Sequence, residues 1–142
     1  MAASLTTKVV VDSGATQTAG SVEAVGNLIA QLQNTVPNFE FWVEHHRLPW
    51  FHFGDGGHLQ ALSRVCFQTT FGRIGIFTFE ATGVPILLGA DLLDEWGADL
   101  SYTQNTMTLK RMKGQPTLKV ERTALGHRLL DIGELALALH SE

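Results

Sequence analysis

The chain has 142 residues, of which 44% are hydrophobic and 17% are charged, and these proportions exclude an intrinsically disordered chain. A formal net charge of −4 argues against nucleic acid as a partner, because phosphate binding requires a basic surface. The length predicts a single domain over residues 1–142 that can bury a core without disulfide bonds.

The first patterned segments are a strand, a turn and a helix. Lys8–Val11 is a β-branched run typical of a buried strand, and Asp12–Thr16 follows it as a tight polar turn. Apolar residues recur at helical spacing over Ser21–Gln33, which predicts a helix. Gly20 or Ser21 can cap its start.

The middle of the chain predicts two hairpins. Phe39–Phe53 has strand-like stretches and leads into Gly54–Gly57, where an Asp-Gly pair favours a tight hairpin turn. A second hairpin is predicted from Cys66–Phe71 to Ile74–Glu80, turning at Gly72-Arg73. Both hairpins indicate a protein rich in antiparallel strands.

A strand that leads into a short helix is predicted next. Pro85–Gly89 is almost entirely apolar, as in a buried strand, and Ala90–Trp96 reads as a helix closed by Gly97. We expect Asp91 to cap or start this helix and to accept hydrogen bonds from backbone amides.

The C-terminal third predicts further strands. Residues 99–109 form a hairpin that turns near Gln104-Asn105, and residues 118–120 and 129–132 are strand candidates. The tail, Leu135–Leu139, fits either a strand with one apolar face or a short helix. In total we expect seven to nine short strands and one or two helices, as in barrels and sandwiches.

The cysteine count and the hydropathy indicate a compartment. The single cysteine, Cys66, excludes an internal disulfide and fits a reducing environment. No apolar run is long enough to span a membrane, and residues 1–7 lack the features of a signal peptide. We therefore expect an intracellular protein with no membrane partner.

An aspartate directly after a buried strand is the clearest chemical signal. Residues 9–15 read Val-Val-Val-Asp-Ser-Gly-Ala, so the strand fixes the Asp12 backbone and nearby amides can bond its carboxylate. Alone, this pattern also suits an aspartate that only caps a turn. A second block, residues 84–93, adds an apolar strand, Gly89 and a helix start at Asp91.

With these blocks in order, the sequence resembles the retropepsin family, the aspartic proteases of retroviruses and LTR retrotransposons. The matching blocks are residues 9–15, the glycine-rich hairpin at 53–57 and residues 86–93, within a resemblance that covers about residues 8–109. It is closer to retrotransposon polyproteins than to mammalian retroviruses. The resemblance implies a mostly β, closed-barrel acid-protease lobe, with its core over about 8–132 and one or two short helices.

The chemistry of that family requires a second copy of the chain. Peptide hydrolysis by aspartates needs two carboxylates that share one proton, and this chain has a single Asp-Ser-Gly motif. The second Asp12 must therefore come from a homodimer with the site on its two-fold axis. We expect residues 133–142 to form part of the dimer interface, because their leucines need a partner surface.

The resemblance assigns roles to the other residues. Asp12 is catalytic, Ser13 hydrogen-bonds across the dimer, and Gly14 presents its amide near the site. An extended peptide from a polyprotein is the expected substrate, with no cofactor and no metal. Its binding residues are Ala15 and Thr16 in the floor, Phe53, Gly54, Asp55, Gly56 and Gly57 in a flap, and Ile86 and Leu87 in the pocket wall.

The sequence departs from the family pattern at two positions. Family members often have an acidic residue where this chain has Thr16, and Arg or Lys where it has Ala90. The segment before Asp12 is also short. Two alternatives follow: a catalytically inactive retropepsin-like module for dimerisation or peptide binding, and a monomeric β-barrel binding protein.

Four histidines near Glu44 form a second cluster in the sequence: His45, His46, His52 and His58. Their spacing matches no established metal motif, so we interpret them as residues that flank the flap.

Overall fold

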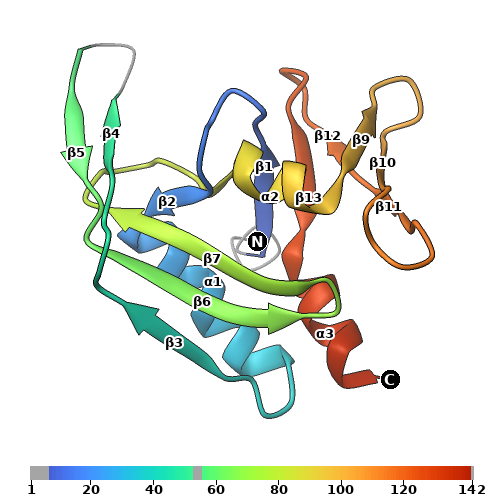
Figure 1. The fold of residues 1–142 in the computed structure, drawn as a ribbon, viewed down its shortest axis with the longest axis horizontal. Coiled ribbons are helices and arrows are strands. Elements are labelled where there is room, and N and C mark those ends of the chain that lie inside the picture. Colours follow the sequence, from blue (N-terminus) through green and yellow to red (C-terminus); the bar gives the residue numbers. More distant parts are fainter. Residues whose placement is uncertain (1–6, 53–55, 142) are drawn as a thin grey trace.

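The computed structural model describes residues 7–52 and 56–141, with side chains placed to residue 136 at the C-terminal end. In this part the protein is mostly β, with three sheets and three helices (Figure 1). The helices are α1 (Val22–Thr35), α2 (Ala90–Trp96) and α3 (Ile132–Ser141). The strands are β1 (Lys8–Val11), β2 (Ala19–Ser21), β3 (Phe41–Glu44), β4 (Trp50–His52), β5 (His58–Gln60), β6 (Ser63–Thr69), β7 (Gly72–Phe79), β8 (Leu87–Leu88), β9 (Ala98–Ser101), β10 (Thr106–Leu109), β11 (Thr117–Lys119), β12 (Glu121–Arg122) and β13 (Arg128–Asp131).

The largest sheet has eight strands in the order β12-β13-β1-β8-β2-β7-β6-β3. Its strand β1 pairs parallel with β8, with Val10 opposite Leu87, and antiparallel with β13, with Lys8 opposite Asp131. Segments from both ends of the described chain and from its middle therefore meet at β1. The other two sheets are small: β11-β10-β9 and the hairpin β4-β5.

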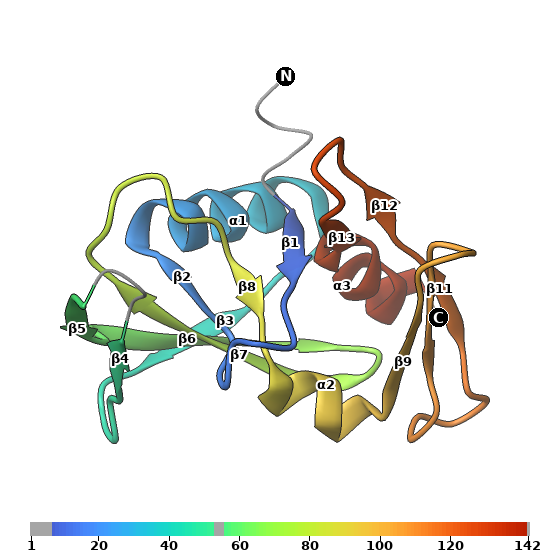
Figure 2. The same ribbon diagram turned by 90° about the horizontal axis from the view of Figure 1, so that it is seen from above.

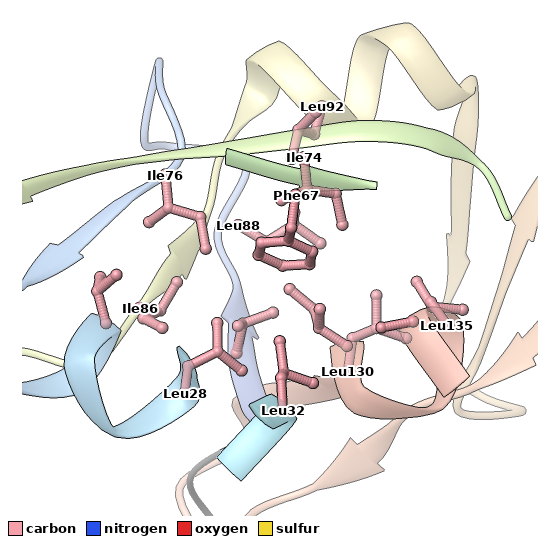
Figure 3. Packing of buried hydrophobic residues seen from close by; sticks show 14 of the residues in the cluster. Leu28, Leu32, Phe67, Ile74, Ile76, Ile86, Leu88, Leu92, Leu130 and Leu135 are labelled. Carbon is pink, nitrogen blue, oxygen red and sulfur yellow. The ribbon is translucent and has the colours of Figure 1, made fainter. Parts of the chain in front are cut away.

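The main core lies between this sheet and helices α1 and α3 (Figures 2 and 3). Strand β7 is buried on both faces, because Ile74 and Ile76 point into the main core while Phe77 and Phe79 belong to a second cluster. A strand covered on both faces is held more firmly than one that faces solvent.

Two of the predicted helices are confirmed: α1 starts one residue later and ends two residues later than predicted, and α2 has the predicted bounds. Ser21 is the N-cap of α1, and its Oγ accepts a hydrogen bond from Ala24 N at 3.2 Å. Helix α2 ends at Gly97, which has the left-handed conformation with φ of 60°. A third helix, α3, exceeds the one or two helices that we expect from the sequence.

The β6–β7 turn lies two residues earlier than predicted. Residues 70 and 71 connect the strands, and Gly72, with φ of 94°, already belongs to β7. The cause is Thr69, whose hydroxyl accepts a hydrogen bond from Phe71 N and donates one to Gly72 O. A Ser or Thr hydroxyl commonly organises a turn in this way.

The C-terminal tail is a helix rather than a strand. Ile132, predicted to belong to a strand, starts α3, and its side chain is buried together with Leu135 and Ala136. These side chains pack into the main core of their own chain. The dimer interface expected over residues 133–142 stays a prediction. No helix in the described part is long and apolar enough to cross a membrane.

Candidate active site

Asp12 directly follows β1, and its backbone N–H makes the last hydrogen bond between this segment and β8. Its N–H donates to Leu88 O at 3.0 Å, and its C=O accepts from Ala15 N at 3.1 Å, which closes a tight turn. Gly14 N donates to Asp12 Oδ1 at 3.0 Å. The carboxylate is half-buried, while Ser13, Gly14 and Thr16 are exposed. The loop therefore presents a fixed carboxylate at the protein surface.

Two glycines allow the backbone to pack closely around this loop. A Cβ on Gly14 would lie 3.2 Å from Asp12 Oδ1, so any side chain there would press on the carboxylate. A Cβ on Gly89 would lie 2.6 Å from the carbonyl carbon of Gln17 and 2.9 Å from Ala15 O. Gly89 thus brings the start of α2 directly against the loop.

Asp91 and Thr18 connect the loop to α2 in a buried hydrogen-bond network. Asp91 Oδ1 accepts from Thr18 N at 2.9 Å, from Thr18 Oγ1 at 2.7 Å and from Leu92 N at 2.9 Å. The Thr18 hydroxyl, which is fully buried, also accepts from Gly89 N at 3.0 Å. The prediction that Asp91 bonds backbone amides at the helix start is confirmed.

The loop and the β4–β5 hairpin enclose a pocket of about 380 Å³. Its lining combines the loop with strand β4 and with parts of β2, β7 and β8: Asp12, Gly14, Ala15, Thr16, Gln17, Ala19, Trp50, Phe51, His52, Phe79 and Leu87. Phe51 anchors the hairpin by packing its ring 5.5 Å from Phe79 and 6.3 Å from Phe77. The Asp12 carboxylate therefore lies at a pocket that strand β4 borders and to which Trp50, Phe51 and Phe79 contribute aromatic side chains.

Most of the described site residues that we predict from the sequence meet at this pocket. Asp12, Gly14, Ala15, Thr16 and Leu87 all line it.

The other predicted site residues lie elsewhere. Ile86 does not line the pocket, because neighbouring side chains in a strand point to opposite faces: its side chain is 3% exposed and packs in the main core. Ser13 lies on the other side of the loop, in a different hollow. Gly56 and Gly57 are exposed in the β4–β5 connection, and Phe53, Gly54 and Asp55 lie outside the described residues.

The histidines do not form one cluster. His52 and His58 face each other across the hairpin with ring centroids 5.8 Å apart, while His45 lines a groove beside α1. Among the residues that the structure describes, no three His, Cys, Asp or Glu side chains are placed to hold a metal ion.

The one cysteine lies away from the pocket, in β6. Cys66 is fully buried, and burial raises the pKa of its thiol. Since a thiolate is the reactive form, this thiol is protected from reaction in the folded protein.

Several residues of the site are absent from our sequence interpretation. Thr18 has no distinctive sequence signal, because a buried polar network becomes visible only when segments far apart in sequence meet. Trp50 and Phe51 could have been predicted as site residues. They come shortly before a glycine-rich turn, so their large rings lie on one strand of the hairpin.

No protein-family model matches the chain, and the search of curated proteins finds no significant match.

Proposed function

We propose that this chain is an aspartic endopeptidase of the retropepsin type, in which Asp12 from each of two copies forms one catalytic pair. The observation that carries the proposal is the position of the Asp12 carboxylate: at the end of a sheet strand, bonded by the Gly14 amide, and at a pocket that is bordered by strand β4 of a hairpin. A turn-capping aspartate requires neither the pocket nor the hairpin. In the proposed assembly each chain contributes one closed-barrel lobe.

The proposed reaction is hydrolysis of a peptide bond by an activated water. One carboxylate of the pair takes a proton from the water, and the other, protonated, donates its hydrogen bond to the scissile carbonyl oxygen. Two nearby carboxylates hold one proton between them, because like charges at short range cannot both ionise at low cost. The Gly14 amide holds the Asp12 carboxylate in its orientation by donating a hydrogen bond to Oδ1.

The two departures from the family pattern have a compensation in the backbone. Ala90 N donates to Ala15 O at 2.7 Å, and Asp91 N donates to Thr16 O at 3.2 Å. These bonds attach the loop to α2 without an ion pair between positions 16 and 90. This favours the active enzyme over the inactive module.

The pocket supports an extended peptide as the substrate. Trp50, Phe51, Phe79 and Leu87 offer apolar surface, which suits large apolar side chains beside the scissile bond. The β4–β5 hairpin stands beside the Asp12 loop and borders the pocket through β4. In this proposal it acts as a flap, pairs with the peptide as an added strand and excludes water. The proposed role is polyprotein processing in the cytoplasm or within a virus-like particle. The single cysteine is buried and forms no disulfide, which fits a reducing compartment.

The decisive experiment is cleavage of a mixed peptide library by Asp12→Asn beside the wild type, from acidic to neutral pH. We expect the variant to lose on the order of 10²- to 10⁴-fold in rate while folding and dimerising as the wild type does. Asp99→Asn is the matched control, because Asp99 is exposed and its carboxylate forms a surface ion pair with Lys110 at 3.0 Å. A statine-type inhibitor should abolish wild-type cleavage.

The other outcomes separate the alternatives. Equal cleavage by Asp12→Asn and the wild type would refute the proposal. A folded dimer that binds peptides but never cuts them would identify the inactive module. A chain that stays monomeric at high concentration would favour the β-barrel binding protein.

A further inference from the structure

The β4–β5 hairpin has one face against the protein and one face in solvent (Figure 1). Phe51 and its partner Leu59 are half-buried, and the Phe51 ring packs against the second hydrophobic cluster. Since side chains alternate along a strand, the neighbours of this pair point to the other face. That outer face carries four exposed side chains: Trp50, His52, His58 and Gln60.

Two histidines lie directly opposite each other on this outer face. The strand pairing sets His52 against His58, and their ring centroids are 5.8 Å apart. Residues that are opposite each other in an antiparallel pair project their side chains to the same side at close range. The sequence spacing of the two residues does not show this contact, because only the strand register brings them together.

The ring of His58 is also packed against a second aromatic side chain. Trp50 lies diagonally across the hairpin from it, with ring centroids 5.4 Å apart and an angle of 56° between the ring planes. A packed ring has fewer orientations to lose when it binds a ligand, which lowers the cost of forming a site. His52, the other member of the pair, lines the Asp12 pocket.

The separation of the two imidazole rings suits a single shared metal ion. An imidazole nitrogen binds Zn²⁺ at about 2.0–2.1 Å, so two imidazoles on one tetrahedral ion have ring centroids on the order of 5–6 Å apart. The distance of 5.8 Å between His52 and His58 falls in this range. Imidazole is a good ligand for Zn²⁺, Cu²⁺ and Ni²⁺, whereas Mg²⁺ and Ca²⁺ prefer oxygen ligands.

We propose that His52 and His58 together bind one divalent transition-metal ion, such as Zn²⁺, on the outer face of the hairpin. Water completes the coordination, since the described residues place no third His, Cys, Asp or Glu beside the pair. The ion joins β4 to β5 and so stiffens a two-stranded hairpin that is marginally stable by itself. A stiffened flap would admit substrate more slowly, and this consequence alone rests on the proposed function.

The test is a calorimetric titration of the full chain with ZnCl₂ at neutral pH. We expect His52→Asn and His58→Asn each to raise the dissociation constant at least about tenfold, because each variant keeps only one of two linked ligands. His127→Asn is the matched control, because His127 is exposed in the β12–β13 turn and should leave Zn²⁺ binding unchanged. MgCl₂ should give no binding.

Hydrogen exchange of the β4–β5 amides gives a second measurement. With ZnCl₂ at about ten times its dissociation constant, exchange in the wild type should slow on the order of tenfold. The same ZnCl₂ concentration should leave exchange in both histidine variants unchanged.

The outcomes separate this site from the proposed function, because none of them requires peptide cleavage. Binding of Zn²⁺ that is weakened in both hairpin variants, with His127→Asn as the wild type, supports the site. A wild type that binds no Zn²⁺ overturns it, and so does Zn²⁺ binding that either hairpin variant retains in full. Cleavage by the wild type and its loss in Asp12→Asn decide the proposed function separately.

Discussion

The two walls of the Asp12 pocket are built in opposite ways. The loop side is bonded through Thr18, Asp91 and Gly89 into a network whose central hydroxyl is fully buried. The hairpin side, β4–β5, forms a separate two-stranded sheet, and its Trp50 is 55% exposed. Only Phe51 connects it to the second hydrophobic cluster with ring contacts that the described residues define.

This difference matches what each wall has to do in the proposed reaction. A carboxylate that holds a proton must keep its place, and a network with few exposed groups keeps it there. A flap must open for each substrate and close again, and a short two-stranded hairpin is marginally stable by itself. In the proposed reaction the loop side therefore positions the Asp12 carboxylate, and the hairpin side controls access of the substrate.

The largest effect should follow from crowding the loop wall at Gly89. Gly89→Ala places a Cβ within 2.6–2.9 Å of the backbone at Ala15 and Gln17, so that the loop must shift. We expect a loss of about 3 kcal/mol or more in unfolding free energy, measured by urea denaturation. Gly26→Ala is the control: a Cβ there meets nothing within 4 Å, and in helix α1 it should stabilise by about 0.5–1 kcal/mol. If Gly89→Ala changed the unfolding free energy no more than Gly26→Ala does, the close packing of Gly89 against Ala15 and Gln17 would be contradicted.

A smaller loss should follow from removing the central hydroxyl of the network. Thr18→Val keeps the shape but leaves Gly89 N–H without its acceptor and Asp91 Oδ1 with one donor fewer. We expect the free energy of unfolding to fall by about 2 kcal/mol, since leaving a buried polar group without a hydrogen bond has a cost of that order. Thr108→Val removes an exposed hydroxyl pair with Thr117 and should change stability by less than about 0.5 kcal/mol. Equal effects in the two variants would show that burial of the network contributes nothing.

The hairpin wall should show the smallest energetic effects and the fastest motions. Amides of β4–β5 should exchange with solvent before those of β6–β7, because a short exposed hairpin opens locally without global unfolding. Phe51→Ala should lower stability by about 1 kcal/mol, less than a fully buried phenylalanine would, and it should speed that exchange further. Trp50→Ala, at an exposed ring of the same strand, should alter stability less. Hydrogen exchange by mass spectrometry measures the difference, and equal protection in both hairpins would remove the contrast.

The fold was predictable where a pattern is local. Helices α1 and α2 follow from apolar spacing and from residues such as Ser21 and Gly97 that define helix ends. The structure of residues 132–141 could not be predicted, because alternating leucine and alanine suits both a strand and a helix. Packing against α1 and β6 stabilises the helix. Nor did local pattern indicate that β13 would pair with β1, since no turn connects them.

The candidate site divides in the same way. Asp12, Gly14 and Leu87 follow from short motifs, and all three lie at the pocket. Ile86 was assigned to the wrong face, because a continuous apolar run has no alternation to show which side chains face the core. Thr18 could not be identified, since its value depends on Gly89 and Asp91, which are distant in the sequence.

The pairing of β1 has a consequence for synthesis on the ribosome. β1 is translated before both of its neighbours in the sheet, β8 and β13. Until then the Val-rich strand has free edges on both sides, and Asp12 has no fixed position. Contacts so distant in sequence slow folding, so the surroundings of Asp12 are complete only after β13 has been translated.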